Sequence, residues 1–394
     1  PENVGRLGSR RLVTGNEIKR SVGKMSEAHP EWTLGFMPRL SEDESAVGIL
    51  LRTEEHQPIS LRRLLVRNSF RKHPTNTGFV CGATLDQQLV IRDLTEIGHL
   101  FLLGGESARE NFLRTQLLTL LLLNTPGELR LAIAGTESPA FENFIQSPHA
   151  LGRLLPKQVE AQRLLEGLAR EVKRRRQAFT EENTRDLDTY NIKQREQNKA
   201  DLPRILFVID PVDDPQWQST ESQWLPLVTT LLRQGAPVGI HLVLGATKSA
   251  VPVEYESLLA AVRHKIIFRS EGKALIEQIQ DFHPSLIRFI DFFVTDGDGA
   301  AAQIVPVETC AVTDDEILRA VEYWRSNAQQ RQQETQETKI SGTTGVTGLL
   351  DTEKVRRALQ TPPTPPPPSP EQLARATEAL GGQPANRAEA VIST

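Results

Sequence analysis

Short apolar segments alternate with longer amphipathic ones through the middle of the chain. Five apolar runs predict strands: His99–Leu103, Arg130–Ala134, Ile205–Ile209, Ile240–Leu244 and Ile266–Arg269. Three segments with helical spacing accompany them: Arg109–Leu123, Val159–Phe179 and Trp224–Arg233. Continuous apolar strands separated by helices are typical of a parallel sheet that helices cover on both faces. The pattern therefore predicts an α/β fold.

The residues that follow these predicted strands are candidates for a functional site. They are Gly104, Asp210, Gly245–Lys248 and Arg269. In open parallel sheets, ligands bind at the carboxyl ends of the strands. We therefore expect these residues to lie near one another at one edge of the sheet.

The two ends of the chain differ from this α/β segment, which we place at residues 76–327. Residues 1–75 contain a predicted helix at Asn16–Lys24, a strand at Ala46–Leu51 and a helix at Ser60–Val66. We interpret them as a small α/β attachment region. Residues 328–394 hold no aromatic residue, and seven of the ten residues from Thr361 to Pro370 are proline. We expect a disordered tail there, because such a segment has too little apolar surface to fold.

The proline tract has two interpretations. Polyproline segments most often serve as extended spacers. The alternative is a ligand for a partner protein that reads proline-rich sequence. A short helix at Glu371–Leu380 is compatible with either interpretation.

Composition narrows the protein class. The 394 residues allow two or three domains. With 46 basic and 50 acidic residues the net charge is −4, which excludes a globally basic nucleic-acid binder but not a local basic face. Cys81 and Cys310 are the only cysteines, too few for a disulfide framework or a four-cysteine zinc site. They favour reduced core thiols in a cytoplasmic protein.

No segment of the sequence predicts a membrane span. The longest apolar stretch, Leu117–Leu123, is far shorter than the roughly 20 residues that a spanning helix needs. The chain begins with Pro1, and we interpret it as a piece of a longer protein. A membrane anchor upstream of residue 1 stays open as an alternative.

A basic run lies within the longest predicted helix, at Lys173–Arg176. Such a run is usually a solvated helix face. The alternative is a contact with the DNA backbone or with a neighbouring subunit, since clustered Lys and Arg side chains neutralise phosphates. Arg174, Arg175 and Arg176, together with Arg269 after the last strand, are the candidates for that contact.

A strand, a glycine turn and a helix follow one another at His99–Leu123, and this is the frame of a phosphate-binding loop. Such a loop uses glycines to bring backbone N–H groups to the phosphates, a Lys for the β- and γ-phosphates and a Ser or Thr for magnesium. A second apolar strand ending in acidic residues completes the site. Ile205–Asp210 fits that second strand.

The order of these segments resembles the motor domain of the FtsK/SpoIIIE DNA translocases. DLTEIGHLFLLGG at Asp93–Gly105, LPRILFVID at Leu202–Asp210 and GIHLVLGATK at Gly239–Lys248 are similar to family motifs. The resemblance runs in register from about Ala46 to Trp324. It implies a RecA-like P-loop NTPase fold, ATP-driven DNA translocation and a ring of FtsK-like subunits.

The phosphate-binding loop departs from the family pattern GxxGSGKS. Aligned on Gly104, this chain has Gly104, Gly105, Glu106, Ser107, Ala108, Arg109, Glu110 and Asn111. Glu110 stands where the family has its lysine, so a carboxylate would face the triphosphate. Asn111 replaces the magnesium-binding Ser, and Ser107 and Arg109 replace glycines. A lysine-to-glutamate exchange turns attraction into repulsion in a partly desolvated site.

The second strand and the sensor segment also depart from the family. Asp210 is kept, but Pro211 replaces the glutamate that positions the attacking water. In the sensor-like pair Thr247–Lys248, the lysine stands where the family has Gln. We interpret Arg109 as a solvated residue at the start of the helix; the alternative is that it swings into the loop and replaces the missing lysine.

Together these departures predict a degenerate FtsK/SpoIIIE-like subunit that does not hydrolyse ATP. Neither ATP nor magnesium is then expected as a cofactor. The subunit would act as a DNA-binding or protein-interaction member of a ring or larger complex. The alternative is an active ATP-dependent DNA translocase with an unorthodox nucleotide site.

Overall fold

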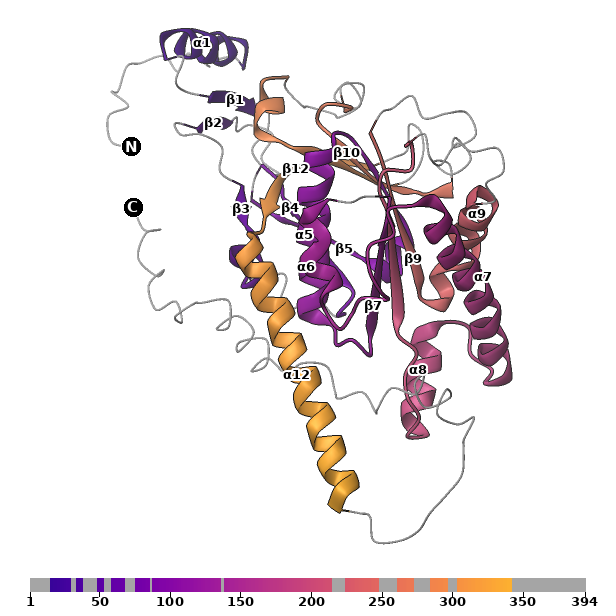
Figure 1. Cartoon of the computed structure of the whole chain (residues 1–394). Helices are drawn as coiled ribbons and strands as arrows, with labels where there is room; N and C mark the ends of the chain where they lie inside the picture. Colours follow the sequence, from indigo (N-terminus) through magenta and orange to yellow (C-terminus); the bar gives the residue numbers. More distant parts are fainter. Residues whose placement is uncertain are drawn as a thin grey trace.

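A computed structural model describes residues 15–29, 33–37, 48–52, 58–67, 75–85, 87–135, 138–214, 224–247, 261–272, 284–296 and 303–341. The centre of the molecule is a large β-sheet with helices on both sides (Figure 1). Strands β10 (His264–Phe268), β6 (Leu100–Leu103), β9 (Ile240–Ala246), β8 (Arg204–Ile209) and β7 (Leu129–Ala134) lie in that order, all parallel. The predicted parallel sheet is therefore confirmed.

An antiparallel half extends this sheet beyond β10. Strands β11 (Phe292–Asp296), β12 (Gln303–Ala311), β4 (Gly78–Ala83) and β5 (Leu89–Asp93) follow in that order, each antiparallel to its neighbour. β12 also pairs in parallel with the two-residue strand β3 (Ile59–Ser60). The resulting ten-stranded sheet joins segments from across the described chain.

The two faces of the sheet carry separate apolar cores. Along β8, Leu206 and Val208 belong to one core, whereas Phe207 and Ile209 belong to the other. This alternation follows from the twofold repeat of side chains along a strand. Helices α5 (Glu106–Leu123), α6 (Glu142–Ile145) and α12 (Asp314–Ser341) supply the first core. Helices α7 (Gln158–Glu181), α8 (Leu187–Glu196) and α9 (Trp224–Gln234) supply the second core.

Several short elements complete the described structure. Helix α1 (Gly15–Ala28) and the antiparallel pair β1 (Thr33–Met37) and β2 (Gly48–Arg52) come first. The others are α2 (Leu61–Leu65), α4 (Leu94–Ile97), η1 (Pro139–Phe141), η3 (Ala236–Val238) and η5 (Pro284–Phe289). Within the described residues, no helix has the length and apolar character needed to cross a bilayer.

The structure moves both predicted region boundaries. Strand β3 pairs with β12, and Leu61 and Leu64 of α2 are buried in the first core. The boundary at residue 75 therefore does not separate this segment from the sheet. Helix α12 continues to Ser341, so a disordered tail beginning at residue 328 is wrong for residues 328–341. This polar segment is rich in Gln and Glu and lacks Gly and Pro, which favours helix. Residues 342–394, with the proline tract, lie outside the described residues.

Candidate functional site

The carboxyl ends of β6, β8 and β9 meet at one edge of the sheet, as predicted. The backbone N–H of Gly104, directly after β6, donates to the Ala246 carbonyl at 3.0 Å. The N–H of Val212 donates to the Gly245 carbonyl at 2.7 Å. These bonds hold Gly104, Asp210 and Gly245 together at the position where the sequence predicts a site.

The segment that resembles a phosphate-binding loop is mostly helix. Only Gly104 and Gly105 separate β6 from α5, which begins at Glu106. Gly104 has φ 151°, and a Cβ atom there would lie 2.6 Å from the Cβ of Phe268. Glycine is required at this position because both the backbone angle and the close approach exclude a side chain. The other residues of the predicted loop form the first turns of the helix.

Arg109 is buried in the centre of the site. Its Nε donates to Oδ1 of Asp210 at 2.7 Å, and the two side chains are 1% and 3% exposed. Its Nη1 donates to the carbonyls of Gly104 and Ala246, the second at 3.3 Å. The interpretation of Arg109 as a solvated helix-start residue is therefore wrong. The guanidinium instead connects the ends of β6, β8 and β9.

The neighbouring strand β9 has a glycine, Gly245, where it passes this ion pair. A Cβ atom on Gly245 would lie 2.0 Å from Oδ1 of Asp210 and 3.2 Å from Nε of Arg109. Only glycine leaves room for both groups at once. Sequence reasoning placed Gly245 at the sheet edge but missed this role, since the clash depends on the position of a side chain from another strand.

The electrostatics of the site are dominated by burial and by carboxylates. Burial raises the pKa of Asp210 to about 6, while Arg109 acts in the opposite direction. Glu110 and Glu106 raise the pKa of Asp210 further through their negative charge. The first two turns of α5 thus place two acidic residues near an edge where a triphosphate would need positive charge.

These residues do not fit a magnesium–triphosphate group held as in a phosphate-binding loop. Magnesium needs free oxygen ligands, but the Asp210 carboxylate is engaged by the Arg109 guanidinium. Asn111 replaces the expected hydroxyl, and Pro211 brings no carboxylate that could orient water. We therefore route no chemical step through a bound nucleotide.

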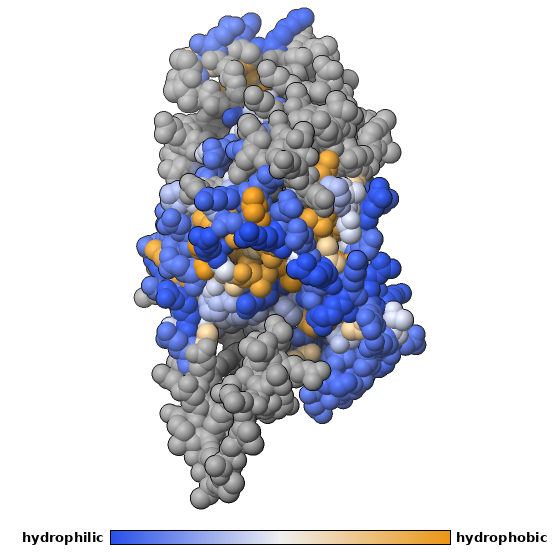
Figure 2. All heavy atoms as spheres, turned by 45° about the vertical axis from the view of Figure 1, so that its right-hand side comes forward, coloured by the Kyte–Doolittle hydropathy of each residue, from blue (hydrophilic) through white to orange (hydrophobic). Residues whose placement is uncertain are grey.

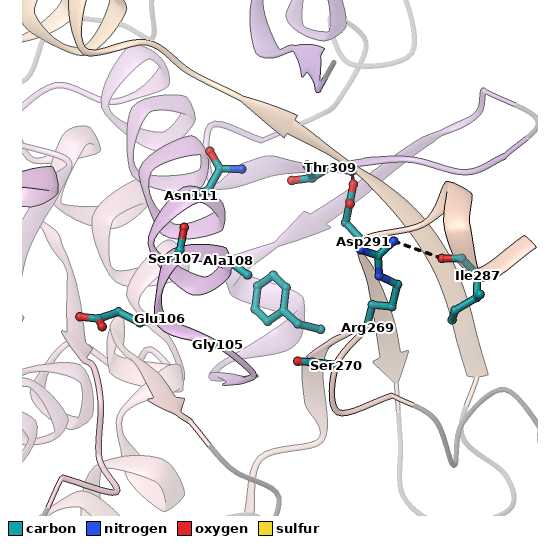
Figure 3. Close-up of a pocket in the computed structure, with 11 residues that line it drawn as sticks. Gly105, Glu106, Ser107, Ala108, Asn111, Arg269, Ser270, Ile287, Asp291 and Thr309 are labelled. Atoms are coloured by element: carbon teal, nitrogen blue, oxygen red, sulfur yellow. Dashed lines mark hydrogen bonds between the residues drawn. The ribbon is translucent and has the colours of Figure 1, made fainter. Parts of the chain in front are cut away.

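A cavity of about 830 Å³ opens beside the start of α5. On one side it is lined by Gly105, Glu106, Ser107, Ala108 and Asn111, and on the other by Phe268–Ser270, Ile287, Asp291 and Thr309. Figure 3 shows Arg269 and Asp291 across from Ser107 and Ala108. Arg269 donates to the carbonyls of Ile287 and Ile290 at 3.4 and 3.3 Å, so backbone contacts hold it at the cavity wall.

The sensor-like segment is tied to the loop that follows β8. The backbone N–H and Oγ1 of Thr247 each donate to a carboxylate oxygen of Asp213 at 2.9 Å. The Asp213 side chain thus anchors the residue that directly follows β9. Lys248 lies outside the described residues.

The three arginines of the basic run, which were proposed as DNA or subunit contacts, differ in their exposure to solvent and in the groups that they contact. Arg175 is 2% exposed; it pairs with Glu171 at 2.7 Å and donates to the Val238 carbonyl at 2.8 Å. Arg174 is exposed and pairs with the same glutamate, while exposed Arg176 donates to Gln234 at 2.9 Å. Arg175 therefore joins α7 to the segment before β9 and is not available at the surface.

Comparisons with known proteins agree with this architecture. The model of the FtsK/SpoIIIE family matches residues 60–266. The DNA translocase FtsK of Helicobacter pylori strain ATCC 700392 / 26695 is 23% identical over 289 residues, covering 73% of this chain and 33% of the relative. This chain thus spans about a third of the length of that curated relative.

Two solved structures share the fold. The cytoplasmic domain of the Thermomonospora curvata type VII secretion ATPase EccC has a TM-score of 0.54 at 16% identity, over 68% of this chain and 34% of EccC. The pCW3 conjugation coupling protein TcpA has a TM-score of 0.51 at 16% identity, over 77% of this chain and 84% of TcpA. The family model matches more than half of the chain, so the chain is a member of the FtsK/SpoIIIE family.

Proposed function

We propose that this chain is an FtsK/SpoIIIE-family subunit that neither binds magnesium–ATP nor hydrolyses it, and that acts by binding other molecules. The observation that carries the proposal is the buried ion pair between Arg109 and Asp210. In this proposal the guanidinium takes the place of the metal ion at the acidic end of the second strand. Glu110, where the family has its lysine, and Pro211 support the same conclusion.

The proposed binding role follows from family membership and from the proposed loss of ATP binding and hydrolysis. We propose that the subunit joins a ring or larger complex with FtsK-like subunits and contributes a surface for DNA or protein. A partner protein for the proline-rich tail belongs to the same proposal. Cys81 and Cys310 are buried thiols that are not joined in a disulfide; they support a reducing compartment such as the cytoplasm.

Calorimetric titration of the purified chain with magnesium–ATP, combined with a phosphate-release assay, tests the proposal. We expect no binding heat and no release of phosphate. Micromolar binding together with phosphate release would establish the opposite, an active translocase with an unorthodox site.

A repaired loop provides the matched comparison. Arg109→Gly, Glu110→Lys and Asn111→Ser in one variant remove the guanidinium and restore the family residues. We expect this variant to gain nucleotide binding but no hydrolysis, because Pro211 still cannot orient water. A repaired variant that stays folded in melting curves but binds no better than the parent would show that Arg109, Glu110 and Asn111 are not what excludes the nucleotide.

A further inference from the structure

The solvent-facing side of α7 carries an organised row of residues. Val159, Arg163, Gly167, Arg170 and Arg174 recur at helical spacing along it. The opposite side of the helix packs into the second core through Leu165, Leu168, Val172 and Phe179. Figure 2 brings this side of the molecule forward and shows mostly hydrophilic residues with apolar patches between them. The row spans about four helical turns, or roughly 22 Å.

Arg174 on this row pairs with Glu171, but the positive charges of the other two arginines are not neutralised by an ion pair within the described part of the chain. Arg163 and Arg170, with Lys173 beside them, are exposed, and none has an ion pair to another described residue. The whole chain has a net charge of −4, so this cluster is a local feature. Unpaired cations in a row attract a partner whose negative charges have matching spacing.

Gly167 adds a second, independent feature. A glycine within a helix is unfavourable relative to alanine, and nothing inside the protein requires it here. An added Cβ would meet only the Nη2 atom of Arg170, at 3.9 Å. The glycine therefore leaves a shallow gap between two arginines. Such gaps allow the backbone of another element to approach closely, as small residues do where helices cross.

The surroundings of the row favour a protein over a nucleic acid. Val159 is 58% exposed and offers an apolar contact at one end. Glu160 and Glu166 flank the row, and Glu166 accepts a hydrogen bond from Gln162 of the same helix at 3.3 Å. A continuous line of phosphates along the helix would meet these carboxylates as well as the arginines. A protein can place its carboxylates opposite the arginines alone.

We propose that this row of α7 docks an acidic, helical segment of a partner protein, with its backbone crossing at Gly167 and its carboxylates facing Arg163, Arg170 and Lys173. The proposal names the partner chemistry for the interaction role stated above and rests on it. The partner needs small residues at the crossing point and an apolar residue near Val159.

Fluorescence anisotropy with the full chain tests this docking. The probe is a labelled synthetic helix with glutamates at helical spacing on one face, an alanine-rich centre and one leucine at the end. A peptide of the same composition with permuted positions is the control. We expect the ordered peptide to bind and the permuted peptide to bind at least about tenfold more weakly.

Two variants locate the contact. Arg163→Glu, Arg170→Glu and Lys173→Glu together reverse the cluster at positions without ion pairs, and we expect about a tenfold or greater loss of affinity. The same exchange at exposed Lys24, Arg63 and Arg325 is the matched control and should leave binding unchanged. Gly167→Leu should abolish binding while keeping the helix. Melting curves verify that each variant is folded.

The outcomes are decisive for the proposal. Failure of the ordered peptide to bind, equal loss in both triple variants, or unchanged binding by Gly167→Leu each overturns it. Binding of a short DNA duplex that is lost in the α7 variant, with no peptide binding, would assign the row to nucleic acid instead. Phosphate release measured on the same samples keeps the two proposals separate, because peptide docking can hold even if ATP is hydrolysed.

Discussion

Nε of Arg109 lies 2.7 Å from Oδ1 of Asp210, in a pair that brings the start of α5 against the end of β8. Both groups are removed from water, and the guanidinium also donates to two strand-end carbonyls. Each charged group therefore depends on the other for its solvation. A buried charge that loses its partner is strongly destabilising, even where the pair itself adds little net stability.

Arg109→Ala should lower the free energy of unfolding by about 3–5 kcal/mol, because it leaves the Asp210 carboxylate buried without a partner. Urea unfolding measures the change. The double variant Arg109→Ala with Asp210→Ala should recover part of the loss, since no unpaired charge remains. Simple additivity of the two single losses would show that the residues do not act as a pair.

Gly245→Ala should destabilise the protein by about 1–3 kcal/mol, because its methyl group would overlap Oδ1 of Asp210. Gly105→Ala is the matched control at the same edge. A Cβ on Gly105 has nothing within 4 Å, so its effect on unfolding should be small. Similar losses for both variants would contradict the assigned role of Gly245.

Arg175→Ala should cost about 3 kcal/mol or more, since it leaves Glu171 without its buried partner and the Val238 carbonyl without a donor. Arg174→Ala removes an exposed contact to the same glutamate and should cost less than about 1 kcal/mol. Denaturant midpoints for the two variants provide the comparison. An equal cost at both positions would show that the burial of Arg175 is unimportant.

Stability should fall as the pH drops below neutral. Burial lowers the pKa of His99 and His149 to about 4 and that of His241 to about 3, from 6.5. Between pH 6.5 and about 4 the unfolded chain binds protons at these sites and the folded chain does not, so unfolding is favoured. Asp210, with its pKa raised to about 6, acts in the opposite sense below that pH.

The loss of stability from the three imidazoles exceeds the gain from the Asp210 carboxyl group. Each imidazole contributes roughly 2 kcal/mol of lost stability by about pH 5. Urea unfolding across this range measures the sum, and His241→Asn tests one contribution. A free energy of unfolding that rises from neutral pH to about pH 5 would contradict the assignment of neutral, buried imidazoles.

Removal of residues 342–394 should leave the melting temperature within about 4 °C of the full chain, because the segment has no aromatic residue and only scattered apolar ones. The last described anchor of α12 is Trp324, whose Nε1 donates to the Leu121 carbonyl at 2.8 Å. Trp324→Ala should therefore destabilise the protein much more than the truncation does. A larger effect from truncation would show that the tail docks on the folded body.

The sequence was sufficient to predict those features that depend on residues close to one another along the chain. Ile205–Ile209 alternates between two cores and is followed by an acidic residue, and both the strand and its place at the site were predictable. Arg109 was misjudged because its partner lies 101 residues away. From the sequence alone, a charged residue at the start of a helix is expected to be solvated, because the packing of another strand against it is not known.

The burial of Arg175 was missed because its neighbours in the sequence are basic, although the sequence does contain a signal for it. Leu168, Val172, Arg175 and Phe179 follow one another at helical spacing, and the other three are apolar. Position 175 therefore belongs to the buried stripe of α7 by periodicity alone. The pairing of β3 with β12 was not predictable for a different reason, because it joins residues some 250 positions apart, which no local pattern records.

The positive charge that pairs with Asp210 is a side chain, Arg109, and so it is part of the polypeptide itself. An ion or nucleotide leaves its site when its concentration in the cell falls, but a side chain on the neighbouring helix has a constant local concentration. Closure of this edge by Arg109 is thus independent of the supply of ATP and magnesium. In the ring proposed above, this subunit would therefore keep one conformation at its strand ends while its neighbours bind and hydrolyse ATP.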